Sequence, residues 1–128
     1  MGVRFGMMVG MLVAAAVARG ASAQTAVTGA PDSSLLAVGQ LRVGRAIFHG
    51  QGQCVVCHGA RLEGGPAAPP LTAHPWKDAK DGSYTAILAV VNTGVPGTAM
   101  VRHPGGISDD QARQVAAYVW AVGHGVTK

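Results

Sequence analysis

Apolar residues recur at helical spacing in three segments of the chain, which predicts three main helices. The first segment covers residues 35–49, and its apolar positions follow at intervals of four, three and four: Ala37, Leu41, Gly44 and Phe48. Ser33 or Ser34 is expected to cap this helix, because a serine hydroxyl accepts hydrogen bonds from the free N–H groups of a first turn. A glycine in mid-helix costs about 1 kcal/mol relative to alanine, so Gly44 predicts close approach by another helix; a merely tolerated glycine is the alternative.

The other two segments complete a chain without clear strand signals. Residues 83–91 are predicted to be helical, with one apolar side formed by Tyr84, Ile87, Leu88 and Val91. The last helix is predicted to begin at Ser108, which opens the capping-box pattern Ser-Asp-Asp-Gln, and to stop at Gly123. Its apolar side consists of Val115, Tyr118, Val119 and Val122. The predicted fold class is therefore all-α.

The start of the chain has the pattern of an export signal. Arg4 precedes an apolar stretch over residues 5–18, and Ala21-Ser22-Ala23 offers the small residues at which signal peptidase cuts. The stretch is shorter than the ~20 residues that span a bilayer, which favours cleavage over the alternative of an uncleaved membrane anchor. We predict a signal peptide over residues 1–23, a flexible N-terminal lead-in over 24–36 and one domain over 37–125.

Charge argues against nucleic acid as a partner. Loss of the signal removes Arg4 and Arg19, which leaves eight basic against six acidic residues and lowers the net charge from +4 to +2. The basic pI of the whole chain is therefore poor evidence for nucleic-acid binding.

The pattern Cys54-Val-Val-Cys57-His58 carries the strongest chemical signal. Cys-x-x-Cys-His is the attachment signature of c-type haem, in which two thiols bind the haem vinyl groups and the histidine ligates the iron. Structural zinc is a weaker alternative, because there is no third cysteine and the other histidines are scattered. A redox-active cysteine pair would follow a strand, and none is predicted before Cys54. Buried haem would also complete a core that has only two Phe, two Tyr and two Trp.

The order of these elements resembles that of a class I cytochrome c over residues 37–124. Gly44 and Phe48 match the first-helix positions at which the family's terminal helices cross, and Val115 and Tyr118 match the last-helix positions. The resemblance implies a cytochrome c fold: three to five short helices around one covalently attached haem c, with loops rich in glycine and proline. It also implies attachment of the haem outside the cytoplasm, which fits the export signal.

The second axial ligand follows from the same resemblance. Met100 is the one methionine left after signal removal, and it lies in a Gly/Pro loop similar to the family's methionine-ligand loop. Val101 departs from the family, which often has proline at this position. His103 is the alternative ligand in the same loop, although a surface position is the more favoured reading of this residue.

Further roles are implied for the loop after the haem motif. The resemblance places a backbone carbonyl of Pro69 on the free nitrogen of His58 and packs Leu71 on the haem. Trp76 is expected either to donate its indole N–H to a haem propionate or to pack in the core. His49 is expected to end the first helix, and His74 and His124 are expected to face solvent.

Ligation by His58 and Met100 would leave the iron without an open position, which implies electron transfer rather than catalysis. The expected protein is a periplasmic carrier between a dehydrogenase or quinol-oxidising complex and a terminal oxidase or reductase. It would act through its exposed haem edge, as a monomer or in transient complexes, without a membrane anchor after signal cleavage. Two alternatives stay open: a dedicated haem subunit of a multiprotein oxidoreductase, and a haem enzyme or gas sensor with a displaceable Met100.

Overall fold

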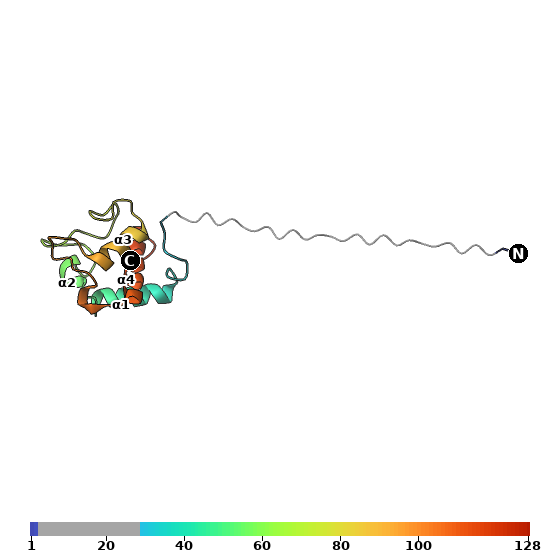
Figure 1. Ribbon diagram of the computed structural model, residues 1–128, viewed down its shortest axis with the longest axis horizontal. Helices are drawn as coiled ribbons and strands as arrows, with labels where there is room; N and C mark the ends of the chain where they lie inside the picture. The colour runs from blue at the N-terminus through green and yellow to red at the C-terminus, as the bar shows by residue number, and fades with distance from the viewer. Residues whose placement is uncertain (3–28) are drawn as a thin grey trace.

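The structure, a computed structural model, describes residues 1–2 and 29–128. The described residues form four α-helices and one 3₁₀ helix without a named strand: α1 (Val38–His49), α2 (Val55–His58), α3 (Tyr84–Thr93), η1 (Pro104–Gly106) and α4 (Asp109–Gly123). Figure 1 shows α1 along one edge of the domain, with α3 and α4 above it and α2 near its end. The all-α prediction is confirmed.

The crossing of α1 and α4 forms the centre of the domain. A Cβ atom added to Gly44 would overlap the Gln114 carbonyl oxygen and lie 2.8 Å from Cβ of Tyr118. Only glycine therefore allows this approach, which confirms the predicted role of Gly44. Beside it, the rings of Phe48 and Tyr118 meet edge to face with their centroids 5.9 Å apart.

Helix α3 packs on the other side of α4. Ser83 caps it by accepting a hydrogen bond from the Ala86 N–H at 3.1 Å, and the helix runs to Thr93, two residues beyond the predicted end. Ile87 and Val91 are its buried residues, and they belong to the hydrophobic core. The predicted apolar side of this helix is the side that the core buries.

The sequence predicted the start of α4 correctly but not the start of α1. The capping box of α4 is present: Ser108 accepts from the Gln111 N–H at 3.2 Å, and the Gln111 side chain accepts from the Ser108 N–H at 2.9 Å. The predicted start of α1 was wrong. The helix begins at Val38, and no side chain caps it.

A turn occupies the positions where the first helical turn was expected. The Asp32 carbonyl accepts hydrogen bonds from Leu35 and Leu36, and the Ser34 carbonyl accepts from Ala37. The backbone bonds of this turn replace the side-chain cap predicted for Ser33 or Ser34. Apolar spacing alone does not distinguish such a turn from the start of a helix.

The described part of the predicted lead-in packs against the domain. Pro31 is buried, and Ala30 and Leu36 lie against the core. The Gly29 carbonyl accepts from the Tyr84 N–H at 2.6 Å, which satisfies a free donor at the start of α3. Residues 29–36 therefore contact the rest of the domain at Gly29, Ala30, Pro31 and Leu36, while the flexible lead-in over 24–36 stays a prediction.

The predicted signal peptide lies almost entirely outside the described residues. Among the residues that are described, no helix is long and apolar enough to cross a membrane.

Candidate functional site

An open apolar cavity lies between α2, α3, α4 and the two long loops. Its helical walls are the inner faces of the terminal helices and α3: Phe48, Ile87, Val90, Val91, Val115 and Val119. The sequence assigned most of these residues to apolar helix faces, but it gave no sign that part of each face borders a cavity rather than a neighbouring helix. Lys77 and Asp78 are the only oppositely charged pair in the lining.

Cys54, Cys57 and His58 lie together on one wall of this cavity. The single turn of α2 holds the last two, and Gly59 ends it with a φ of +82°, a conformation that favours glycine. Both cysteines are free, Cys54 half-buried and Cys57 exposed. Burial raises the pKa of the Cys54 thiol to about 11, so this thiol is protonated at neutral pH.

A hydrogen bond from the following loop orients His58. Its Nδ1 donates to the Pro69 carbonyl at 3.0 Å, and because a carbonyl can only accept, the proton lies on Nδ1. The Nε2 lone pair is then free to bind a metal. Gly64 holds the loop in place: a Cβ atom there would lie 2.6 Å from the Pro70 nitrogen and 2.7 Å from the Pro69 carbonyl carbon.

Leu71 and Trp76 line the cavity next to this loop. The Leu71 N–H donates to the Leu62 carbonyl at 2.7 Å, and the indole N–H of Trp76 donates to the Leu71 carbonyl at 3.3 Å. The Trp76 ring is buried, with 5% of its surface exposed. Of its two expected roles the structure has core packing, since a backbone carbonyl already accepts the indole proton.

Met100 reaches the same cavity from the loop between α3 and η1. The loop folds back on itself: the Val95 N–H donates to the Met100 carbonyl at 2.8 Å, and the Met100 N–H donates to the Thr98 hydroxyl at 3.1 Å. Val101 follows as an exposed residue of the cavity lining. The structure thus brings His58 from α2 and Met100 from the loop after α3 to one cavity.

His103 does not line the cavity. Its Nε2 lies 3.0 Å from Oδ1 of Asn92 and 3.4 Å from Oδ1 of Asp109. Both partners are acceptors in this arrangement, so Nε2 carries a proton and has no lone pair for a metal. His103 is thus held outside the cavity by Asn92 and Asp109, and its half-buried position corrects the expectation of a surface residue. Neither polar partner was apparent from the sequence.

The remaining histidines make aromatic contacts that the sequence did not reveal. His74 is exposed but stacks on His124, with centroids 4.3 Å apart, and His124 stacks in turn on Trp120 at 4.2 Å. The expectation of a solvent-facing His124 was therefore wrong, because it is half-buried in this stack. His49 ends α1 as expected, and its ring packs edge to face on Phe48.

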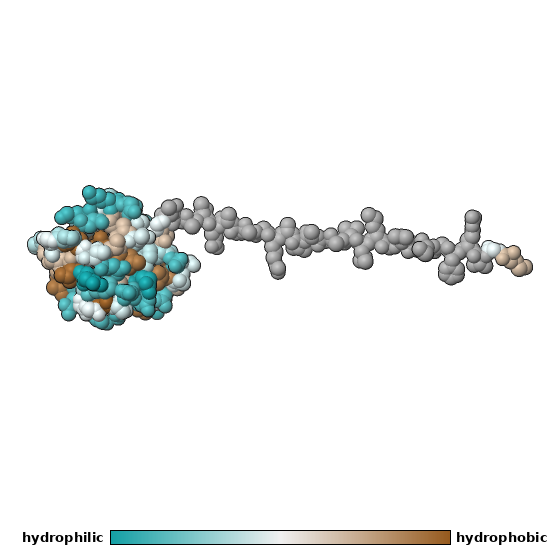
Figure 2. All heavy atoms as spheres, viewed as in Figure 1, coloured by the Kyte–Doolittle hydropathy of each residue, from teal (hydrophilic) through white to brown (hydrophobic). Residues whose placement is uncertain are grey.

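One apolar residue of the cavity lining, Val101, and one next to the lining residue Cys57 in the sequence, Val56, are exposed. Val56 in α2 is 77% exposed, and Val101 beside Met100 is 59% exposed. Figure 2 shows apolar residues reaching the surface of the domain in patches among hydrophilic ones.

The residues of the cavity fit a covalently held haem. Two free thiols, an imidazole nitrogen available for a metal and a thioether face a cavity whose other walls are mostly apolar. These are the attachment and ligand groups of c-type haem, and apolar walls suit the macrocycle. A zinc centre has no such support, because the described residues hold no group of three or more His, Cys, Asp or Glu side chains that could bind a metal.

Comparison with solved structures independently identifies the fold. Cytochrome cL from the marine methylotrophic bacterium Methylophaga aminisulfidivorans MPT has a TM-score of 0.58 and 20% identity, covering 66% of this chain and 56% of that one. Cytochrome cL from Hyphomicrobium denitrificans has a TM-score of 0.56 and 24% identity, covering 75% and 52%. The chain spans about half the length of these two proteins, so the likeness shows the cytochrome c fold alone.

Sequence comparison supplies the family. No curated protein matches the chain. A family model described as cytochrome C oxidase, cbb3-type, subunit III matches residues 39–119, which is more than half of the chain and includes the haem motif, the methionine loop and most of α4. The chain belongs to this family of c-type cytochromes, whose cofactor is covalently bound haem c.

Proposed function

We propose that the chain is a periplasmic electron carrier in which Cys54 and Cys57 attach one haem while His58 and Met100 ligate its iron. One-electron exchange is the chemistry that haem supplies when it is bound. The observation that supports this proposal best is that His58, in α2, and Met100, in the loop after α3, line the same apolar cavity. The predicted signal over residues 1–23 supports the compartment.

The chain's own residues would set the conditions for electron exchange. The Pro69 carbonyl fixes the tautomer and orientation of the His58 ring, and the apolar walls keep most water from the metal. A thioether as the second ligand raises the reduction potential relative to a second imidazole. The exposed Val56 and Val101 would let a partner approach closely without displacing charged groups.

The partners would be a dehydrogenase or quinol-oxidising complex as donor and a terminal oxidase or reductase as acceptor, met in brief encounters by a monomer. A second candidate is a dedicated haem subunit of a multiprotein oxidoreductase, which the family's description as an oxidase subunit favours. Gel filtration of the protein from its native host separates the two. A monomeric elution volume supports the carrier, and co-elution with an oxidoreductase supports the subunit.

Replacement of Met100 tests the ligand assignment. The full precursor is expressed with haem-attachment machinery, and spectra are recorded for the wild type, Met100→Ala and a control in the same loop, Val101→Ala. We expect Met100→Ala to lose the near-infrared methionine-to-ferric-iron band, bind carbon monoxide and show a lower potential, while Val101→Ala keeps the band. Unchanged spectra in Met100→Ala would remove Met100 from the iron. Carbon monoxide binding by the wild type would favour an enzyme or sensor.

A further inference from the structure

At its C-terminal end, the Met100 loop is attached to α3 and α4 through His103. Hydrogen bonds inside the loop, between Val95, Thr98 and Met100, give it a shape but do not tie it to the rest of the domain. At its end, the His103 N–H donates to the Val91 carbonyl in α3 at 2.9 Å. The His103 side chain then reaches both α3 and α4.

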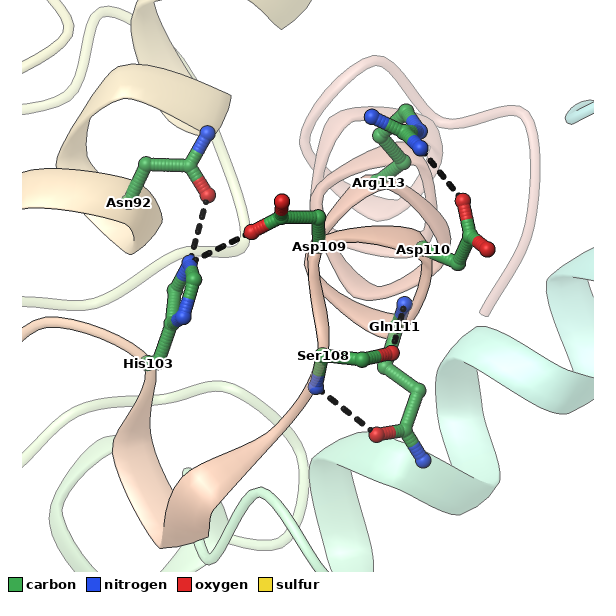
Figure 3. Close-up of polar contacts among 7 residues, drawn as sticks. All are labelled: Asn92, His103, Ser108, Asp109, Asp110, Gln111 and Arg113. Atoms are coloured by element: carbon green, nitrogen blue, oxygen red, sulfur yellow. Dashed lines mark hydrogen bonds and ion pairs between the residues drawn. The ribbon is translucent and has the colours of Figure 1, made fainter.

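Figure 3 shows this polar anchor, which we define as His103, Asn92 and Asp109. The Nε2–H of His103 points between Oδ1 of Asn92, at 3.0 Å in the last part of α3, and Oδ1 of Asp109, at 3.4 Å in the first turn of α4. The His103 side chain is only 18% exposed, whereas Asp109 is 77% exposed. The imidazole thus fills the space between two helices and a loop.

The backbone of His103 supports the same reading. It has a φ of +43° and a ψ of +60°, the left-handed conformation that residues other than glycine adopt infrequently. Such a conformation persists where surrounding contacts hold it; here they include the polar anchor, the bond to the Val91 carbonyl and the bond that the His103 carbonyl accepts from the Gly106 N–H at 2.9 Å. At this position, a side chain that forms specific hydrogen bonds therefore matters more than a residue type, such as glycine, that readily adopts the left-handed backbone.

We propose that His103 is a positioning residue, which fixes the loop to α3 and α4 and thereby holds Met100 at the cavity. This inference rests on the proposed role of Met100 as a ligand. It gives His103 a part in controlling access to the iron without contact with the cavity. Loss of the polar anchor would free the loop to move away, so that a small ligand could compete with Met100 more easily.

Cyanide binding to the ferric holoprotein measures that competition. His103→Asn keeps a residue that tolerates the left-handed region, but its shorter side chain loses the paired contacts. We expect its cyanide dissociation constant to fall about tenfold, the size of effect that follows from loss of a charge-assisted hydrogen bond. Asp109→Ala should lower the cyanide dissociation constant about threefold to tenfold.

Asp110→Ala is the matched control for Asp109→Ala. Both remove one carboxylate from the first turn of α4, but Asp110 pairs with Arg113 and does not touch His103 (Figure 3). The two variants should therefore lose similar stability in denaturant, while only Asp109→Ala binds cyanide more tightly. Equal cyanide affinities in Asp109→Ala, Asp110→Ala and the wild type would overturn the inference, even if His103→Asn does not fold.

The near-infrared band distinguishes failure of this inference from failure of the ligand assignment. If the wild type has the band and Met100→Ala loses it, Met100 is the ligand, and the cyanide series alone decides the role of His103. If Met100→Ala keeps the wild-type spectrum, the ligand assignment fails and the positioning role fails with it. If the spectrum changes in His103→Asn but not in Met100→Ala, His103 is itself the ligand and the inference is overturned.

Discussion

Two adjacent glycines after the haem motif differ sharply in the space around them. Gly64 has a φ of +79°, and a Cβ atom there would lie within 2.9 Å of three backbone atoms of residues 68–70. A Cβ atom on Gly65 would lie 3.6 Å from the nearest atom, the Cys57 carbonyl oxygen. The first glycine therefore determines where the Pro69 carbonyl stands relative to His58.

Gly64→Ala is expected to destabilise the holoprotein by about 2 kcal/mol or more. The left-handed backbone alone is unfavourable for alanine by about 1–2 kcal/mol, and the contact with residues 68–70 adds to this loss. Gly65→Ala should change stability by less than about 0.5–1 kcal/mol, since its surroundings are open. Denaturant unfolding of both variants measures the difference, and equal losses would show that the loop adapts to a side chain at Gly64.

Sequence reasoning at this scale found residues whose roles depend on motif and chain order. Cys54, Cys57, His58 and Met100 follow from a short pattern and from the order of elements, and their ligand roles remain predictions. It did not predict contacts between side chains that are far apart in the sequence. The stack of His74 on His124 depends on tertiary placement, which no local pattern encodes.

The helices show which features of an element a sequence determines well. Apolar spacing predicted all three main helices, and the capping box predicted the start of α4 correctly, because its two hydrogen bonds depend on residues three positions apart. The prediction of the start of α1 was wrong because no side-chain pattern marks that start. The turn formed by the Asp32 carbonyl has no side-chain signature of its own.

Helix α1 contains a second glycine that allows a matched test of the crossing. Gly44→Ala should lower the free energy of unfolding by about 1–3 kcal/mol, because its methyl group would push α1 away from Tyr118 and the Gln114 carbonyl. Gly39 lies in the same helix with nothing within 4 Å of an added Cβ atom. Gly39→Ala should therefore raise stability by about 0.5–1 kcal/mol through helix propensity. Stabilisation by both substitutions, in thermal or denaturant unfolding, would contradict the close crossing.

For the molecule as a whole, the segment before α1 is part of the packed domain. Residues 29–36 contribute the buried Pro31, the contacts of Leu36 and the carbonyl of Gly29 at the start of α3. No local pattern predicted this packing, since the segment is short and its apolar residues have no regular spacing. The predicted domain start at residue 37 remains a prediction, but the stable unit should need the preceding residues.

Two deletions test this extended boundary. A chain in which residue 37 directly follows residue 23 should be about 1–2 kcal/mol less stable than one in which residue 29 follows it, because buried apolar surface and a backbone hydrogen bond are lost. Denaturant midpoints of the two holoproteins measure the loss. Equal midpoints would mean that residues 29–36 lie on the domain without stabilising it.

The crossing of α1 and α4 also determines when the domain can close. The side chain of Gln114 donates to that of Gln40, 74 positions earlier in the chain, and the Phe48 to Tyr118 contact lies in the same region. Contacts that distant in sequence form late, since the entropy of a long loop has to be lost before they add stability. The first helix therefore stays without its packing partner until α4 folds onto it, which leaves the Cys54 and Cys57 segment between them accessible to attachment enzymes until the two helices meet.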